Sequence, residues 1–215
     1  ENTVIGYGHW RTASPKEVLP AGPAGTVATA NVAYVTWAET NLGGQVTVRF
    51  ARSTNGGFSW LPAQTLYTVQ AGEVIDGAET RLLAMGHQVF LVFASNGHTL
   101  VAGQQAVFAM ASGDQGQTWT APTLLSTQSL TTLRDVDEVN AVLSQNLPGS
   151  PASLNVVYES DYNVPASGIE DLYFVQAELS GGALVLTVPD QRINLAVAPR
   201  GSDVNFTSIA ADGPV

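Results

Sequence analysis

One segment of the chain occurs twice, and this repeat constrains the fold more than any other feature. Ser53-Thr-Asn-Gly-Gly-Phe-Ser-Trp60 is matched 59 residues later by Ser112-Gly-Asp-Gln-Gly-Gln-Thr-Trp119, and both are preceded by similar apolar runs. A fainter copy surrounds Trp10, and a fourth copy keeps only a Gly181-Gly182 turn. Such self-similarity indicates that the chain folds as a series of like units whose connecting loops differ in length.

Each unit predicts four β-strands. Short runs rich in β-branched and aromatic residues precede the repeated segments, at 33–38, 89–94 and 154–159. Each of these runs is itself preceded by another candidate strand, at 26–32, 78–85 and 136–143. Apolar residues do not recur at helical spacing anywhere in the chain. We therefore expect an all-β protein.

Repeated four-stranded antiparallel units are typical of the blades of a β-propeller. A two-sheet sandwich also has many short strands, but it does not repeat one turn in register. We expect a single domain over residues 1–215 with about three full blades and two partial ones. The expected division is a last strand of a preceding blade at 1–21, blades at 22–70, 71–128 and 129–200, and a lone first strand at 201–215.

This count of blades does not close a ring, because propellers have about four to eight blades. Unpaired sheet edges and uncovered blade faces favour association. We therefore expect either the remainder of a longer chain or self-association to complete the propeller.

Charge and composition limit the partners. The formal net charge is −10, and only 12% of the residues are charged. Nucleic acids and anionic membranes attract basic surfaces, so we expect neither as a partner, and no apolar run is long enough to span a membrane. The chain has no Cys, which rules out disulfides and thiolate chemistry. Its scarcity of Lys and of charge suggests a secreted or cell-surface protein.

The repeated turn resembles the Asp box, Ser-x-Asp-x-Gly-x-Thr-Trp, of the sialidase-like (BNR-repeat) β-propeller family. The second copy matches all five fixed positions with Ser112, Asp114, Gly116, Thr118 and Trp119. The first copy, with Ser53, Asn55, Gly57 and Trp60, replaces Asp by Asn and Thr by Ser. The resemblance implies a sialidase-like propeller in which these turns connect the third and fourth strands of a blade, opposite the ligand face.

Local chemistry favours a structural role for these turns. Asp and Asn side chains accept hydrogen bonds from backbone N–H groups a few residues ahead, and Gly adopts positive φ without a steric penalty. We expect both Trp side chains to pack between neighbouring strands.

The resemblance places the ligand face at the opposite end of the blades, in the connections between blades and the loops between second and third strands. Several charged residues fall there and are our ligand-face candidates: Asp76, Arg81, Arg134, Asp135, Asp137, Glu159 and Asp161. This face is acidic. Tyr158 and Glu159 look like a sialidase nucleophile pair, but adjacent strand residues point to opposite faces.

Sialidases hold a carboxylate sugar with three Arg residues, and this chain offers two at most on the ligand face, Arg81 and Arg134. We therefore assign no catalytic residues and expect a non-catalytic extracellular propeller for carbohydrate or surface recognition, or a scaffold. A glycan or cell-surface molecule is the expected ligand. Two alternatives stay open: a glycoside hydrolase, exo-sialidase-like, whose catalytic set is incomplete in this chain, and a purely structural assembly subunit.

No cofactor or metal site is predicted. The three His residues have no metal-ligand spacing. An acidic oxygen cluster would suit Ca²⁺, but the sequence around Asp135 lacks the spacing of a dedicated calcium loop.

Overall fold

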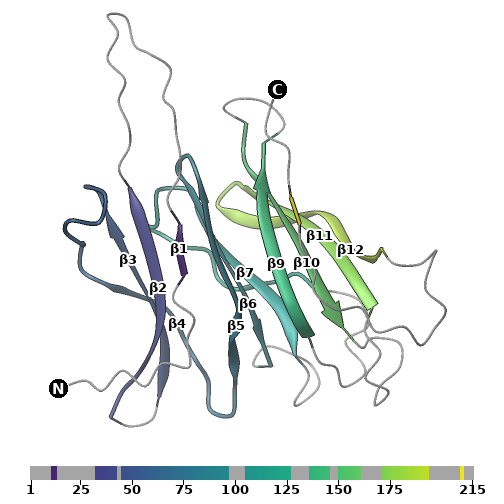
Figure 1. Ribbon diagram of the computed structural model, residues 1–215, viewed down its shortest axis with the longest axis horizontal. Coiled ribbons are helices and arrows are strands. Elements are labelled where there is room, and N and C mark those ends of the chain that lie inside the picture. The colour runs from purple at the N-terminus through teal and green to yellow at the C-terminus, as the bar shows by residue number, and fades with distance from the viewer. Residues whose placement is uncertain are drawn as a thin grey trace, which may run out of the picture.

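The computed structural model describes residues 11–13, 32–42, 45–96, 105–126, 136–145, 150–160, 171–193 and 209–210. Within these residues the chain forms three antiparallel sheets of four strands, and no helix occurs (Figure 1). The all-β prediction is therefore confirmed. No helix long and apolar enough to cross a membrane is present in the described part of the chain.

Each sheet is a meander in which every strand pairs with the next one along the chain. Sheet 1 contains β1 (Arg11–Ala13), β2 (Ala33–Thr40), β3 (Val46–Ser53) and β4 (Gln64–Thr68). Sheet 2 contains β5 (Ile75–Met85), β6 (Gln88–Ser95), β7 (Ala106–Ser112) and β8 (Thr123–Leu124). Sheet 3 contains β9 (Val136–Ser144), β10 (Ser153–Ser160), β11 (Asp171–Ser180) and β12 (Ala183–Arg192).

The first strand of sheet 1 corrects one expectation. The segment near Trp10 was expected as the last strand of a preceding blade, with residues 26–32 as the first strand of the next. Instead, β1 pairs antiparallel with β2, with Thr12 opposite Val35. The edge of β2 needs one hydrogen-bonded neighbour, and β1 supplies it. Val32 is not in a strand, and residues 26–31 lie outside the described part of the chain.

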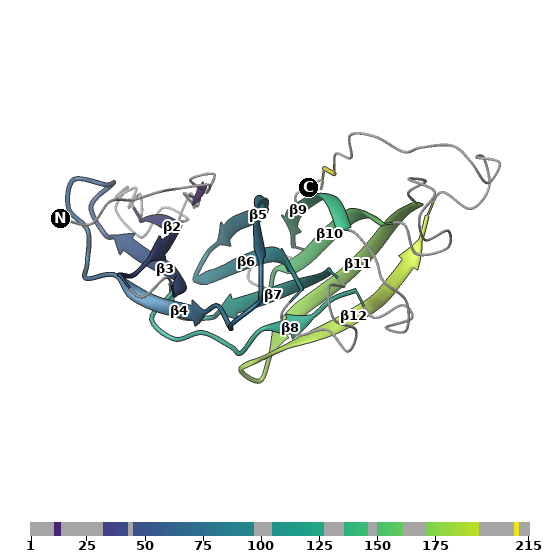
Figure 2. The same ribbon diagram turned by 90° about the horizontal axis from the view of Figure 1, so that it is seen from below.

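The three sheets lie in an arc, as Figure 2 shows, with β5 and β9 on its inner side and β4, β8 and β12 on its outer side. The first strands of neighbouring sheets contact one another, β1 with β5 and β5 with β9. The strands of successive sheets thus radiate outward from a shared inner edge.

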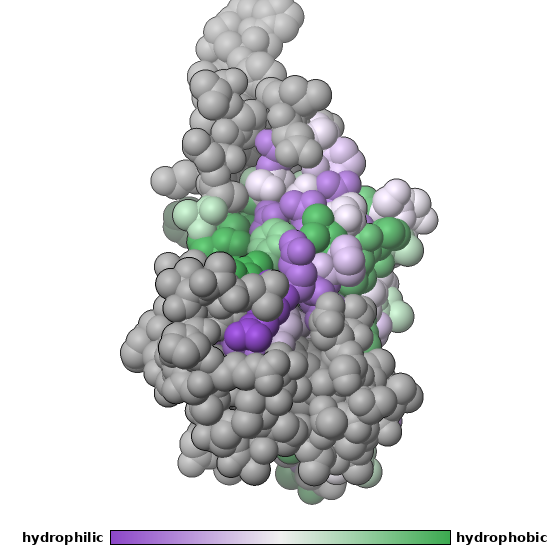
Figure 3. Space-filling view, turned by 90° about the vertical axis from the view of Figure 1, so that its right-hand side faces the viewer, coloured by the Kyte–Doolittle hydropathy of each residue, from purple (hydrophilic) through white to green (hydrophobic). Residues whose placement is uncertain are grey.

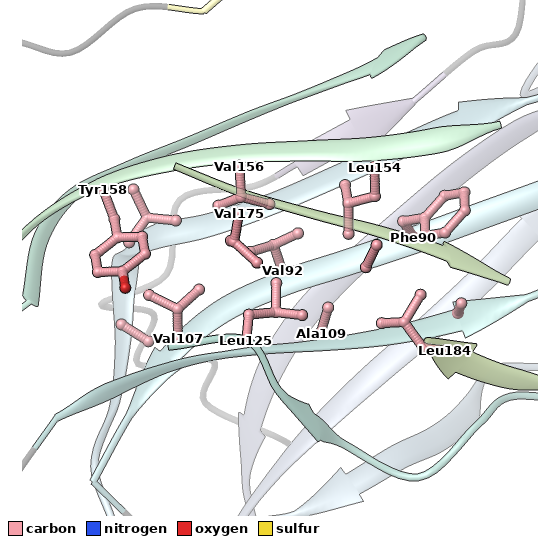
Figure 4. Packing of buried hydrophobic residues seen from close by; sticks show 14 of the residues in the cluster. Phe90, Val92, Val107, Ala109, Leu125, Leu154, Val156, Tyr158, Val175 and Leu184 are labelled. Atoms are coloured by element: carbon pink, nitrogen blue, oxygen red, sulfur yellow. The ribbon is translucent and has the colours of Figure 1, made fainter. Parts of the chain in front are cut away.

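Two apolar clusters hold the sheets together. The larger one lies between sheets 2 and 3, where Val92 and Val107 face Val156 and Tyr158 (Figure 4). The second lies between sheets 1 and 2 and includes Phe50 and Phe93. Burying such side chains stabilises the fold by about 1.5–3 kcal/mol each. Sheet 2 packs on both faces, which explains why every residue of β7 is buried.

The sheets share one register, which allows positions to be compared between them. Ala38 on β2 pairs with Val48 on β3, and Ala94 on β6 pairs with Val107 on β7. In sheet 3 the corresponding pair is Glu159 on β10 with Leu172 on β11. Residues 38, 94 and 159 therefore occupy equivalent places near the ends of the second strands.

Candidate functional site

The two ends of the sheets differ in chemistry. At one end, called the box end, the third strands turn into the fourth; it carries the first box turn (residues 53–60) and the second box turn (residues 112–119). At the other end, called the open end, the second strands finish at Thr40, Ser95 and Ser160.

The second box turn is organised around the carboxylate of Asp114. Its Oδ1 accepts hydrogen bonds from the Ser112 hydroxyl (2.8 Å) and from the N–H groups of Gln117 (2.9 Å) and Thr118 (2.8 Å). Its Oδ2 accepts from the Thr118 hydroxyl at 2.7 Å. Burial by itself raises the pKa of Asp114. The hydrogen bonds from Thr118, Ser112 and Gln117 outweigh this effect and lower the pKa to about 2. The carboxylate thus closes the turn and is fully engaged.

The first box turn has the same net with an amide in place of the carboxylate. Asn55 Oδ1 accepts from the Ser53 hydroxyl and from Ser59 N–H, both at 2.9 Å, and its Nδ2 donates to Ser59 Oγ at 2.8 Å. Gly57, at φ +93°, donates its N–H to Ser53 Oγ at 2.8 Å. Both polar atoms of the Asn55 side chain form hydrogen bonds within the turn, so these contacts are structural.

The two tryptophans, expected to pack alike, do not. Trp119 packs edge-to-face on Phe50 of sheet 1 with ring centroids 5.0 Å apart, and its indole N–H donates to Gly116 O at 3.2 Å. Trp60 is 44% exposed. The physical reason is that the second box turn leans on the preceding sheet, whereas sheet 1 is the first of the described sheets. The expectation of equal packing is wrong for Trp60.

Two of the seven ligand-face candidates have described side chains, Arg81 and Glu159. Arg81 on β5 donates from Nε to Asn140 Oδ1 on β9 at 3.2 Å, and so links sheets 2 and 3. Asp76 lies on β5 and Asp137 on β9, where only their backbones are described. The other three, Arg134, Asp135 and Asp161, lie outside the described residues.

Glu159 is a buried carboxyl residue near the open end of sheet 3. It is 1% exposed, and the equivalent residues in sheets 1 and 2 are Ala38 and Ala94. The fold is built twice with a methyl group at this position, so it does not require a carboxyl group there. Burying a carboxyl group is costly, which makes Glu159 a functional candidate by the usual physical criterion.

The strand beside Glu159 is irregular. Val157 on β10 pairs with Asn140 on β9, but Glu159 pairs with Asp137, so Glu138 and Val139 together oppose Tyr158. This is a β-bulge. Glu138 within it has φ +51°, a left-handed conformation that residues other than Gly rarely adopt. Bulges of this kind re-aim side chains and are frequent next to active sites.

Tyr158 points to the other face, as alternation along a strand requires. It lies in the cluster between sheets 2 and 3 (Figure 4). Its ring stacks on Tyr173 with centroids 5.5 Å apart, and its hydroxyl donates to Asp190 Oδ2 at 2.9 Å. Close by, Arg192 Nη2 and Asp171 Oδ1 form an ion pair at 2.6 Å. Tyr158 and Glu159 therefore do not act as a pair in one pocket.

Sequence reasoning missed Asp171, Asp190 and Arg192. They come from β11 and β12, in the copy of the repeat that has lost its box, so no motif marks them. The one available signal was positional: Asp171 opens a third strand where the equivalent residues of sheets 1 and 2 are Thr47 and Ala106.

A row of polar side chains crosses all four strands on the face of sheet 3 turned away from sheet 2. Asn155 Nδ2 donates to Ser144 Oγ, Gln176 Nε2 donates to Asn155 Oδ1, and Thr187 Oγ1 donates to Gln176 Oε1, at 2.8–2.9 Å. Figure 3, which views the molecule from this side, shows hydrophilic residues between apolar ones. Glu159 shares this face with Asn155 because the two are four residues apart on β10.

Arginines do not converge within the described residues. Arg49 pairs with Glu39 on sheet 1 at 3.3 Å, Arg192 pairs with Asp171 on sheet 3, and Arg81 bridges β5 and β9. The described residues also contain no group of three His, Asp or Glu side chains arranged to hold a metal ion.

The chain is similar in structure to two fungal glycosidases. One is the GH93 α-L-arabinofuranosidase of Fusarium graminearum in complex with arabinobiose, at TM-score 0.50 and 12% identity, covering 86% of this chain and 50% of that one. The other is the α-L-arabinanase of Penicillium chrysogenum with arabinobiose, at TM-score 0.51 and 14% identity, covering 89% and 52%. This chain has a propeller-like all-β fold. It spans about half the length of these two proteins. No family profile and no curated protein matches the sequence.

These similarities correct the expected function. The prediction of a non-catalytic propeller for recognition or scaffolding is wrong, because the similar solved structures are glycoside hydrolases, and the glycosidase alternative fits better. The error came from using the three-arginine set as a general test of catalysis. Those arginines are needed to bind an anionic sugar, and hydrolysis of a neutral glycoside requires carboxyl groups instead.

Proposed function

We propose that the propeller is a glycoside hydrolase that acts on a neutral sugar, with Glu159 as one of its catalytic carboxyl groups. The observation that carries this proposal is the burial of Glu159 at a position where the two sister sheets have alanine. The two similar structures are an α-L-arabinofuranosidase and an α-L-arabinanase, which supports the reaction class and suggests the first substrates to test.

Glycoside hydrolysis needs two carboxyl groups with different roles. One, in the acid form, donates its proton to the glycosidic oxygen as the bond to the anomeric carbon breaks. The other, ionised, either attacks the anomeric carbon or removes a proton from the attacking water. In this proposal Glu159, shielded from water, is the proton donor. The β9 bulge, which lies opposite Tyr158 and next to the pairing partner of Glu159, supplies the second group, and Glu138 is the described candidate.

The substrate is neutral for an electrostatic reason. The chain carries a net charge of −10, and the described arginines do not gather at the open end. A carboxylate-bearing sugar would therefore be repelled there rather than held. Both catalytic roles fall to side chains of the protein, so the proposal needs no cofactor and no Ca²⁺.

Three finer expectations belong to the same proposal. The box turns are Asp boxes with a structural role, as their closed hydrogen-bond nets favour. The protein is exported, which suits an enzyme that acts on polymeric glycans. The ring is completed by further blades, whether from a longer chain or from association.

The test is hydrolysis of arabinobiose and of 4-nitrophenyl α-L-arabinofuranoside, together with a panel of other neutral 4-nitrophenyl glycosides. We expect turnover by the wild-type protein and a loss of at least about a hundredfold in kcat for Glu159→Gln, because a general acid contributes about 10²–10⁴-fold. Glu178→Gln is the matched control, since Glu178 binds Ser153 at the box end of the same sheet.

Glu159→Gln must also keep the wild-type circular dichroism spectrum and melting temperature within a few degrees. Full activity in Glu159→Gln would remove this residue from the mechanism. If the wild-type protein hydrolysed none of the neutral glycosides, the proposed function itself would be overturned.

A further inference from the structure

A pocket at the box end, between sheets 1 and 2, has no part in the proposed hydrolysis. Its volume is about 230 Å³, and its walls include Phe50, Arg52, Leu61, Pro62, Gln64 and Gln117. The open end, where Glu159 lies, is at the opposite end of the strands. The space is enough for a single sugar ring.

The pocket exists because the second box turn approaches β3 very closely. Gly116, at φ +80°, lies against Phe50, and a Cβ at this position would be only 2.4 Å from the Phe50 ring. Two hydrogen bonds fix the same approach: Arg52 Nη1 donates to Gln115 O at 3.3 Å, and Gln64 Nε2 donates to Gly116 O. The walls are therefore held in place across two sheets.

Arg52 gives the pocket its charge preference. Arg49 and Arg192 each pair with a carboxylate, whereas no carboxylate among the described residues pairs with Arg52. Its hydrogen bond in the described part of the chain goes to one backbone carbonyl and uses a single guanidinium nitrogen. In a chain with eighteen acidic and eight basic residues, an arginine without a carboxylate partner is available to a carboxylate from outside.

The remaining walls fit a ring that has hydroxyl groups and one apolar face. Leu61, which is 42% exposed, and Pro62 offer apolar surface. Gln64 and Gln117 each use the amide nitrogen in a bond to a backbone carbonyl, of Gly116 and Asp114 respectively. Their amide oxygens are left to accept hydrogen bonds from hydroxyl groups.

We propose that this pocket binds a uronic acid residue. The carboxylate pairs with Arg52, the ring hydroxyls donate to Gln64 and Gln117, and the apolar ring face lies on Leu61 and Pro62. The box end thus holds an acidic sugar while the open end cleaves a neutral one. Binding here depends on the pocket alone, so it can be measured whether or not the hydrolase proposal holds.

The experiment is an NMR titration of the full chain with D-glucuronate and, as the matched neutral sugar, D-glucose. We expect saturable shifts of the Leu61, Gln64 and Gln117 amide signals with glucuronate, and binding of glucose at least about tenfold weaker because it lacks the charge-assisted pair. Arg52→Gln should weaken glucuronate binding to the level of glucose.

Arg49→Gln is the matched control, because it removes the same charge from the same strand but from the other face, and it should bind like the wild type. Arg52→Lys keeps the charge and loses the two-pronged geometry, so it should bind glucuronate with intermediate affinity, and it replaces Arg52→Gln if that variant does not fold. Equal binding of glucose, unchanged binding in Arg52→Gln, or no saturable binding up to millimolar concentrations would overturn the proposal. Equal binding of acetate would show a general carboxylate site and overturn the sugar assignment.

Discussion

At the scale of single residues, the two box turns show how one side-chain atom can organise eight residues of backbone. Asp114 Oδ1 accepts three hydrogen bonds, and Asn55 Oδ1 accepts two in the same places. The carboxylate version has a further bond from the Thr118 hydroxyl to Oδ2. Asn55 donates to Ser59 instead, so the hydroxyl reverses its role between the copies.

The bonds to Asp114 predict a pH effect. Its pKa is lowered from 3.8 to about 2, so the folded state favours the ionised form. The stabilisation is complete above the unfolded pKa and is lost as the pH falls from about 4 toward 2. Asp114→Ala should lower the free energy of unfolding at neutral pH by about 1–3 kcal/mol and flatten this acid dependence. Urea unfolding of the wild type and of Asp114→Ala between neutral pH and pH 2 measures the free energy of unfolding and its pH dependence.

Asn55→Ala is the control for the pH effect. It should also destabilise the protein, but by an amount that does not change with pH, because the Asn55 amide does not titrate in this range. If Asp114→Ala kept the acid dependence of the wild type, the Asp114 carboxylate would not be its source.

At the scale of elements, the sheets are joined at both ends by specific contacts as well as by apolar clusters. At the open end, Glu73 accepts from the Tyr67 hydroxyl (2.6 Å), from Gln70 N–H (2.8 Å) and from the Ser95 hydroxyl (2.5 Å), and so ties sheet 1 to sheet 2. Burial, followed by the hydrogen bond and charge of Glu73, raises the pKa of Tyr67. At the box end, Gly116 and Trp119 lie against Phe50.

Gly116→Ala should disrupt this second junction. The added methyl group meets the Phe50 ring, and Ala tolerates φ +80° poorly, so we expect a loss of about 2–4 kcal/mol from strain and overpacking together. Gly181→Ala is the control, because Gly181 also has positive φ but no atom lies within 4 Å of its added Cβ. In thermal unfolding, the melting temperature of Gly116→Ala should be well below that of Gly181→Ala. Equal melting temperatures would mean that the close packing of Gly116 on Phe50 does not contribute to stability.

At the scale of the whole molecule, the central sheet should be the most stable part. Sheet 2 packs on sheet 1 through one cluster and on sheet 3 through the other, whereas sheets 1 and 3 each have one described neighbour. Native-state hydrogen exchange should therefore show the slowest exchange in β6 and β7 and faster exchange in β2, β3 and β12. Slowest exchange in sheet 1 would contradict this ranking.

The sequence predicted the sheets well because their repeat is a local pattern. Strands β2, β6 and β10 lie where their β-branched and aromatic runs predict, and the box turns connect third to fourth strands. The pairing of β1 was not predictable, because the copy near Trp10 lacks most of the motif. The exposure of Trp60 depends on which sheet precedes sheet 1, and that information is not local.

The candidate site was predictable only in part. Glu159 and Arg81 were placed on the ligand face by their positions in the repeat. The β9 bulge, the positive φ of Glu138 and the Arg192–Asp171 pair depend on how each strand pairs with its neighbour. No pattern within a single strand encodes such features.

The common register of the three sheets makes the molecule its own reference. Residues 38, 94 and 159 occupy the same position in three sheets of the same topology, and only residue 159 has a reactive side chain. The two sheets with alanine at this position show that the sheet forms without a carboxyl group there. A chain assembled from near-identical parts can thus alter one part while the others keep the architecture intact.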